Sequence, residues 1–226
     1  IVNDILDKEF DKKVSRTKDR PLASNKISIG VAIIYVLILC FLALIVLLNF
    51  NIFTIALALG SMPLAFTYPL MKRFTYWPQL FLGITFNYGL ILGWTAISGE
   101  LNIIPIIFYF GAIFWTLGYD TIYGYQDIKD DEIIGLKSTS IKFKDKSKIF
   151  LFICYSVLIL TLILGGYLMN FSSLYFLFLT IPIIHLFYYQ IRLFNSKSST
   201  ICLRLFKSNN LFGLIILLNI LLGKFY

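Results

Sequence analysis

The sequence predicts an all-α fold, a polytopic bundle of transmembrane helices, and three observations support this prediction. The mean hydropathy of the 226-residue chain is +0.82. Only 14% of the residues are charged, which is typical of membrane proteins rather than soluble ones. The apolar runs are close to the ~20 residues that a helix needs to cross a bilayer, and they are continuous rather than alternating, which excludes the strands of a β-barrel.

Seven apolar spans follow one another along the chain. They cover residues 27–48, 52–70, 79–98, 102–123, 148–168, 171–191 and 209–225. Three of the links between them are only two or three residues long, whereas those at 71–78, 124–147 and 192–208 are polar and basic. No repeat or low-complexity linker divides the spans, so we predict a single membrane domain over residues 1–226.

The basic residues predict how the spans are oriented. If residues 1–26 are cytoplasmic, seven alternating spans place the three long links on the same side. That side then carries 19 of the 20 Lys and Arg residues, and only Lys224 lies opposite. This follows the positive-inside rule. The net charge of +8 therefore indicates membrane orientation, and we expect no nucleic-acid partner. The three cysteines lack the spacing of a zinc site and are interpreted as packing residues.

Two acidic clusters predict a cation site. Asn3, Asp7 and Asp11 are spaced four residues apart and would share one face of a helix. Asp127 and Asp131 have the same spacing. An even number of spans separates the clusters, so both should emerge on the same side of the membrane. Carboxylates and diphosphate oxygens are ligands that Mg²⁺ prefers, and we therefore predict Mg²⁺ as a cofactor.

Basic side chains accompany these acids. Arg16 and Arg20 follow the first cluster, Lys72 and Arg73 lie in another inner link, and such groups suit phosphoryl oxygens. A solvated loop would explain the charges but not two stripes on one side. A transporter with a cytoplasmic divalent-cation site would need charged or broken helices near the midplane, where these spans carry almost no charge. Asp120 could be a further ligand or could brace a helix end.

Four motifs carry a resemblance to a known family. They read NDxxDxxxD at 3–11, RTxxRPL at 16–22, YPLMKR at 68–73 and YDTIYGYQDIKDDEIIGLKST at 119–139. Together they resemble the UbiA family of intramembrane aromatic prenyltransferases, and the last motif most resembles the 4-hydroxybenzoate polyprenyltransferase branch, apart from Gly124 where Ala is usual. Members have nine spans, so the resemblance implies that this fragment lacks the first span and nearly all of the second.

The resemblance also implies roles for individual residues. The metal ligands would be Asn3, Asp7, Asp11, Asp127 and Asp131, with Asp4 in support. The diphosphate would be contacted, or its pocket lined, by Arg16, Arg20, Tyr68 and Lys72. The four aspartates and Lys72 would carry the catalysis. Asn87 could orient the acceptor or bond to a neighbouring helix, and His185 is interpreted as a neutral, hydrogen-bonded residue.

The implied reaction transfers a polyprenyl group from polyprenyl diphosphate to the ring of 4-hydroxybenzoate, ortho to its hydroxyl. Mg²⁺ and basic groups would stabilise the departing diphosphate and leave an allylic carbocation, and the product would serve ubiquinone biosynthesis. Related acceptors, namely a naphthoate, homogentisate or haem, are the alternatives. We expect a multi-pass protein of the cell inner membrane, or of the mitochondrial inner membrane, with its acidic motifs on the cytoplasmic side. Prenyl length and oligomeric state stay open.

Overall fold

The computed structural model describes residues 1–225, and these residues form helices and no strands. Seven helical stretches are long and apolar enough to cross a membrane, which confirms the predicted number of spans. They are Ile29–Leu47, Ile52–Phe74, Pro78–Ser98, Ile103–Gly124, Lys144–Leu168, Ser173–Ile191 and Ser199–Lys224. The last begins ten residues earlier than predicted, because the amphipathic helix α12 (Ser199–Lys207) runs into α13 (Asn209–Phe225).

The chain divides into two compact units. The first contains Ile1–Leu101 together with Asp127–Ser138, and the second contains Asn102–Gln126 together with the chain from Thr139 onward. The second acidic cluster therefore belongs to the same unit as the first, although its neighbours in sequence belong to the other unit.

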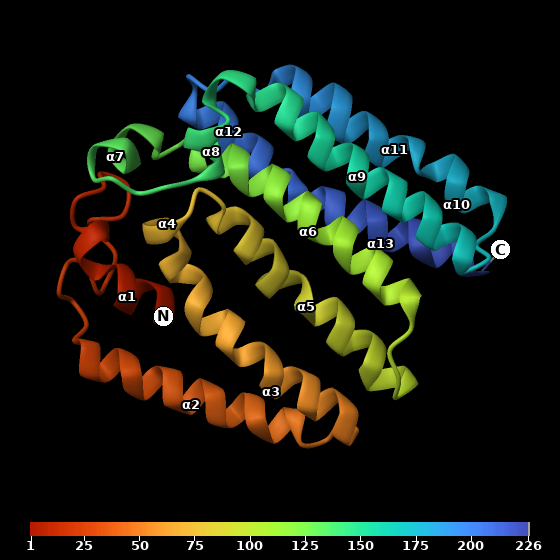
Figure 1. Ribbon diagram of the computed structural model, residues 1–226, viewed down its shortest axis with the longest axis horizontal. Helices are drawn as coiled ribbons and strands as arrows, with labels where there is room; N and C mark the ends of the chain where they lie inside the picture. The colour runs from red at the N-terminus through yellow and green to blue at the C-terminus, as the bar shows by residue number, and fades with distance from the viewer. Residues whose placement is uncertain (226) are drawn as a thin grey trace. The chain divides into compact units, whose positions relative to one another are not determined.

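The first unit is built on three long helices and several short ones (Figure 1). The long helices are α2 (Ile29–Leu47), α3 (Ile52–Thr67) and α5 (Pro78–Ser98), and the short ones are α1 (Val2–Asp11), η1 (Tyr68–Leu70), α4 (Met71–Phe74) and α7 (Ile128–Ile133). Asn51 caps α3 by accepting the Thr54 amide at 2.9 Å and donates to the Thr95 carbonyl at 2.8 Å. This side chain thus ends one helix and joins it to α5.

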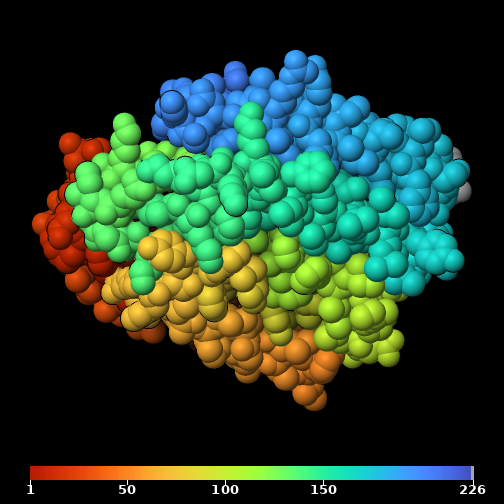
Figure 2. Space-filling view, turned by 45° about the horizontal axis from the view of Figure 1, so that its top comes forward, coloured from red at the N-terminus to blue at the C-terminus, as the bar shows by residue number. Residues whose placement is uncertain are grey.

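The second unit is organised around α6 (Ile103–Gly124) and α9 (Ser147–Leu168), which pack closely along their length. Gly118 permits this approach, because a Cβ there would lie 2.5 Å from Cε1 of Tyr155. Figure 2 shows α9, in teal, lying against the blue segments of this unit. The remaining elements are α8 (Thr139–Lys142), η2 (Lys144–Lys146), α10 (Ser173–Phe178), α11 (Thr180–Ile183), η3 (Ile184–Ile191), α12 and α13.

A buried polar network joins four helices of the second unit. The Tyr155 hydroxyl donates to Gln190 Oε1 at 2.6 Å, and Gln190 Nε2 donates to Asn209 Oδ1 at 3.0 Å. Asn209 Oδ1 also accepts the Trp115 indole N–H at 2.8 Å. His185 Nε2 lies 3.1 Å from Gln190 Nε2, which agrees with the hydrogen-bonded role expected for this histidine. Uncharged hydrogen bonds of this kind hold helices together where hydrocarbon excludes water.

The π-helical geometry of η3 makes this network possible. His185 and Gln190 are five residues apart, so in an α-helix their side chains would diverge by about 140°. A π-helix closes its hydrogen bonds between residues i and i+5, which brings that pair onto one face. Hydropathy predicts the span but not this local winding.

We expect Tyr155→Phe to lower the free energy of unfolding by about 1 kcal/mol, because the change leaves the buried Gln190 Oε1 without its donor. Tyr167→Phe is the matched control on the same helix, since Tyr167 is 73% exposed and Tyr155 is 0% exposed. Unfolding of the two purified variants in detergent measures the difference. Equal stability of the two would contradict the structural role of the network.

Candidate functional site

Helix α1 presents the first acidic cluster. Asp7 is 1% exposed and Asp11 is 6% exposed, whereas Lys12 and Lys13 on the next turn are exposed. The predicted helical stripe of Asn3, Asp7 and Asp11 is therefore present, and its two carboxylates face the interior of the first unit.

Asp7 lies between two cations of α4. Lys72 Nζ is 2.6 Å from Asp7 Oδ2, and Arg73 Nη2 is 3.6 Å from Oδ1. Despite these ion pairs, neither buried carboxylate oxygen accepts a well-directed hydrogen bond from the described residues. Arg73 is held by the Leu6 carbonyl at 2.5 Å and lies 5.0 Å from the centre of the Phe10 ring. Two buried oxygens thus keep unfilled acceptor capacity beside two positive charges.

Arg20 contacts the C-terminal end of the stripe, at Asp11. Its Nη1 donates to Asp11 Oδ2 at 3.0 Å and to Asp4 Oδ1 at 3.1 Å. Asp4 therefore supports the site through Arg20, as its position on another face of α1 suggested. The Thr17 hydroxyl donates to the Asp11 carbonyl at 3.0 Å and fixes the loop that carries Arg20.

The second cluster is joined to this loop by charge-assisted hydrogen bonds. Arg16 Nε donates to both oxygens of Asp127 at 2.9 and 3.0 Å, and its Nη2 donates to Oδ2 at 2.5 Å. The Ser15 amide donates to Asp130 Oδ2 at 3.1 Å. Residues more than 100 positions apart in sequence are thereby brought together, and Figure 1 shows α7 beside the segment that follows α1.

The link that carries Lys72, residues 71–78, is attached to the segment that follows α7. The Lys137 amide donates to the Lys72 carbonyl at 2.9 Å, and Lys137 Nζ donates to the Phe74 carbonyl at 3.2 Å. These bonds hold the segment after α7 against α4. Lys72 is consequently held near both acidic clusters.

Lys72 also influences the ionisation of the second cluster. Burial, together with the neighbouring Asp127 carboxylate, raises the pKa of Asp131 to about 6, although Lys72 and Arg16 oppose the shift. Lys72 is thus in ion-pair contact with Asp7 and electrostatically coupled to Asp131.

Four further residues singled out in the sequence are placed by the structure as follows. Asn3 and Tyr68 line a mainly apolar cavity of about 310 Å³ between α1, α2 and the end of α3. Asn87 donates to the Gly83 carbonyl of its own helix at 2.8 Å, so its predicted contact with an acceptor stays a prediction. Asp120 belongs to the second unit.

Two residues of the assembly were not assigned to the site from sequence. Arg73 contacts Asp7, and Asp130 accepts the Ser15 amide. The position of Arg73 next to Lys72 was a signal for the first. No local pattern distinguishes Asp130 from its neighbours, because its partner lies 115 residues away.

The residues present fit a divalent cation in their chemistry. Their potential metal-ligand atoms are carboxylate and amide oxygens, which divalent cations of this kind prefer. Both Asp7 oxygens are buried and accept no hydrogen bond from the described residues. The side chains are not gathered around one point, however. Over residues 1–225 no three His, Cys, Asp or Glu side chains form a group that could hold a metal ion. Lys and Arg neutralise these carboxylates in the structure.

Asp131 gives the metal-free protein a specific pH dependence. An unfolded Asp131 titrates near 3.8, whereas in the fold its pKa is about 6, so the folded state retains the proton longer as the pH rises. The stabilisation that the protonated Asp131 carboxyl contributes is complete below about pH 3.8 and is lost as the pH rises through about 6. With metals chelated, we expect the Tm difference between the unchanged protein and Asp131→Asn to vary across this range. Asp19→Asn, at an exposed position, is the control, and a constant difference for Asp131→Asn would contradict the burial of this carboxyl.

The chain is similar to known proteins over most of its length. The family model for the UbiA prenyltransferase family matches residues 1–217. The chain is 43% identical to 4-hydroxybenzoate geranyltransferase 2 of Lithospermum erythrorhizon, over all of this chain and 74% of that protein. It is 41% identical to the mitochondrial 4-hydroxybenzoate polyprenyltransferase of Rattus norvegicus, over all of this chain and 60% of that protein.

Two solved structures share the fold. A UbiA homolog from Aeropyrum pernix K1 superposes with a TM-score of 0.81 at 20% identity, covering 97% of this chain and 82% of that one. A digeranylgeranylglyceryl phosphate synthase superposes with a TM-score of 0.70 at 22% identity, covering 98% and 78%. With the acidic clusters joined beside Lys72, seven apolar spans and a family match over nearly its whole length, this chain belongs to the UbiA prenyltransferase family.

Proposed function

We propose that this chain transfers a polyprenyl group from polyprenyl diphosphate to the ring of 4-hydroxybenzoate, ortho to the hydroxyl, for ubiquinone biosynthesis. One observation carries the proposal: the buried Asp7 carboxylate, paired with Lys72, lies in one charged assembly with Asp127 and Asp131. The names of the relatives support the choice of 4-hydroxybenzoate as acceptor.

Asp7, Asp11, Asp127 and Asp131, with Asn3, would hold the Mg²⁺ ions. Bound Mg²⁺ would supply positive charge that neutralises the diphosphate and favours its departure. Lys72 would add charge stabilisation directly, because its ammonium already lies within the assembly.

The ion pairs of the structure suggest how Arg16 and Arg20 act. Each arginine now neutralises carboxylates, Arg16 with Asp127 and Arg20 with Asp4 and Asp11. With Mg²⁺ neutralising these carboxylates, the guanidinium groups of Arg16 and Arg20 would be able to donate to diphosphate oxygens instead. Their planar geometry suits that role.

The length of the prenyl group and the cellular membrane are part of the proposal. The plant relatives are named geranyltransferases and the mammalian ones polyprenyltransferases, at nearly equal identity to this chain. We favour a long polyprenyl donor, which could remain in hydrocarbon during the reaction. We place the protein in the cell inner membrane or the mitochondrial inner membrane, with the acidic clusters on the cytoplasmic or matrix side according to its basic links.

A transfer assay tests the proposed reaction. Membranes carrying the full-length protein would be incubated with labelled geranyl and polyprenyl diphosphates and with 4-hydroxybenzoate, homogentisate or a hydroxynaphthoate. We expect prenylated 4-hydroxybenzoate as the main product, identified by its mass. A product formed only from another acceptor would exclude the proposed substrate but leave prenyl transfer intact.

Removing either cluster should stop this reaction. Asp7→Asn and Asp131→Asn should each lose nearly all transfer while still inserting into the membrane, because each takes a carboxylate from a different cluster. Asp19→Asn should keep full activity, since Asp19 is exposed. Chelation should inhibit the unchanged protein and added Mg²⁺ should restore it. Activity that persists in either site variant, or under chelation, would rule out the two-cluster arrangement.

Lys72→Ala should lower kcat by about 10- to 1000-fold, as expected for loss of one charge-stabilising donor. The Mg²⁺ requirement should remain, because the acidic residues are unchanged. Lys129→Ala removes an exposed lysine of α7 and is the matched control. If kcat per folded molecule is unchanged in Lys72→Ala, Lys72 only anchors a helix end and has no part in transfer.

A further inference from the structure

A basic cavity of about 710 Å³ lies within the second unit, in a part of the chain that the proposed reaction does not use. Its walls come from η2 with the start of α9, from residues 192–196 after η3, and from Ile201 of α12. Four cations and one carboxylate line it, namely Lys144, Lys146, Lys148, Arg192 and Asp145.

The cavity lies at the ends of two candidate spans, where lipid headgroups are expected. The fifth candidate span begins at Lys144 and the sixth ends at Ile191, so both walls are span ends. With alternating spans these two ends lie on the same side of the membrane, the side that carries 19 of the 20 basic residues.

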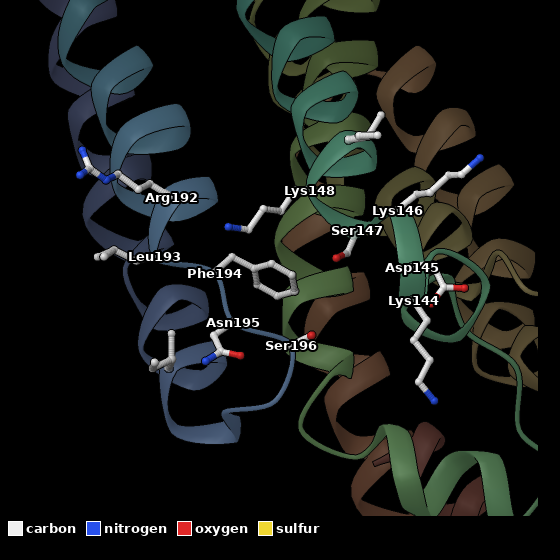
Figure 3. Close-up of a pocket in the computed structure, with 12 residues that line it drawn as sticks. Lys144, Asp145, Lys146, Ser147, Lys148, Arg192, Leu193, Phe194, Asn195 and Ser196 are labelled. Atoms are coloured by element: carbon white, nitrogen blue, oxygen red, sulfur yellow. The ribbon is translucent and has the colours of Figure 1, made fainter.

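Two cations of the cavity, Lys148 and Arg192, differ in their pairing from the cations of the first unit. In the first unit, Arg16, Arg20 and Lys72 each pair with a carboxylate. Within residues 1–225, by contrast, no ion pair involves Lys148 or Arg192. Figure 3 shows Lys148 extending from α9 toward the segment that carries Phe194, while Lys144 and Lys146 point away from it. The Arg192 guanidinium lies 4.7 Å from the centre of the Tyr188 ring.

The loop that forms one wall is fixed in place. Phe194 is buried and packs edge-on against Tyr125, with ring centres 5.1 Å apart. The Asn195 side chain accepts the Lys197 amide at 3.0 Å, and the Asn195 carbonyl accepts the Cys202 thiol at 3.4 Å. The cavity therefore does not require the loop to become ordered when a ligand binds.

An apolar strip continues from the cavity along the same two helices. Ile149 is 62% exposed and Leu193 is 42% exposed, and both line the cavity itself. One turn further, Phe152 of α9 packs edge-on against Phe187 of η3, with ring centres 5.2 Å apart. A free phosphate would gain nothing from this strip, whereas a lipid could place its phosphate near the cations and an acyl chain along the strip.

We propose that this cavity binds an anionic phospholipid, with the headgroup phosphate between Lys148 and Arg192 and an acyl chain beside Ile149 and Leu193. The bound lipid would join α9 to η3 and stabilise the second unit.

The test compares two double variants of the full-length protein in nanodiscs of phosphatidylcholine, with and without phosphatidylglycerol. Lys148→Gln with Arg192→Gln removes both cations of the cavity. Arg204→Gln with Lys207→Gln removes two exposed cations of α12, which do not line it. Phosphatidylglycerol retained by the protein is counted by native mass spectrometry, and the Tm is measured in both kinds of nanodisc.

We expect phosphatidylglycerol to raise the Tm of the unchanged protein and of the α12 variant, but not of the cavity variant. Loss of two cations should weaken lipid binding by roughly 10- to 30-fold. Lys148→Arg with Arg192→Lys should retain it, and the Tm in phosphatidylcholine alone shows whether each variant is folded. Equal lipid loss in the cavity and α12 variants would overturn the proposal, since only overall charge would then matter. Equal protection by inorganic phosphate would also overturn it, because the ligand would then not be a lipid.

Discussion

The first unit depends on one buried ion pair, that of Asp7 with Lys72. The Asp7 carboxylate is almost completely excluded from solvent, and its charge requires compensation at that depth. Lys72 provides it at 2.6 Å, and Arg73 adds a second positive charge. Loss of one partner from a buried pair generally costs about 3–5 kcal/mol, so this contact fixes α1 against α4.

The other contacts of the site extend from that pair. The backbone of Lys72 accepts the Lys137 amide, which ties the segment after α7 to α4. Arg16 then binds Asp127, and Arg20 binds Asp11 together with Asp4. Asp7, Asp11 and Asp127 each form an ion pair with a cation. Asp131 is electrostatically coupled to Lys72 and Arg16. The carboxylates and cations of this assembly thus neutralise one another in the structure without a metal.

The two units solve the problem of buried polar groups in different ways. The first concentrates charge in short helices and loops at the ends of spans, where carboxylates and cations pair with one another. The second places an uncharged network of Tyr155, Gln190 and Asn209 inside its helices. This division follows from energetics, because an uncharged hydrogen bond is tolerated in hydrocarbon whereas an isolated charge is very costly.

The sequence by itself determined the features that depend on local periodicity. Seven spans follow from apolar length, and the stripe of Asn3, Asp7 and Asp11 follows from the pitch of a helix. The parity of the spans predicted that both acidic clusters emerge on one side of the membrane, and the structure places both clusters in the first unit. Only the tertiary structure decided which cation meets which carboxylate, since the Arg16–Asp127 and Arg73–Asp7 contacts join residues 111 and 66 positions apart. It also decided the π-helical winding that brings His185 to Gln190, because an apolar run predicts a span but not whether its backbone hydrogen bonds close at i+4 or at i+5.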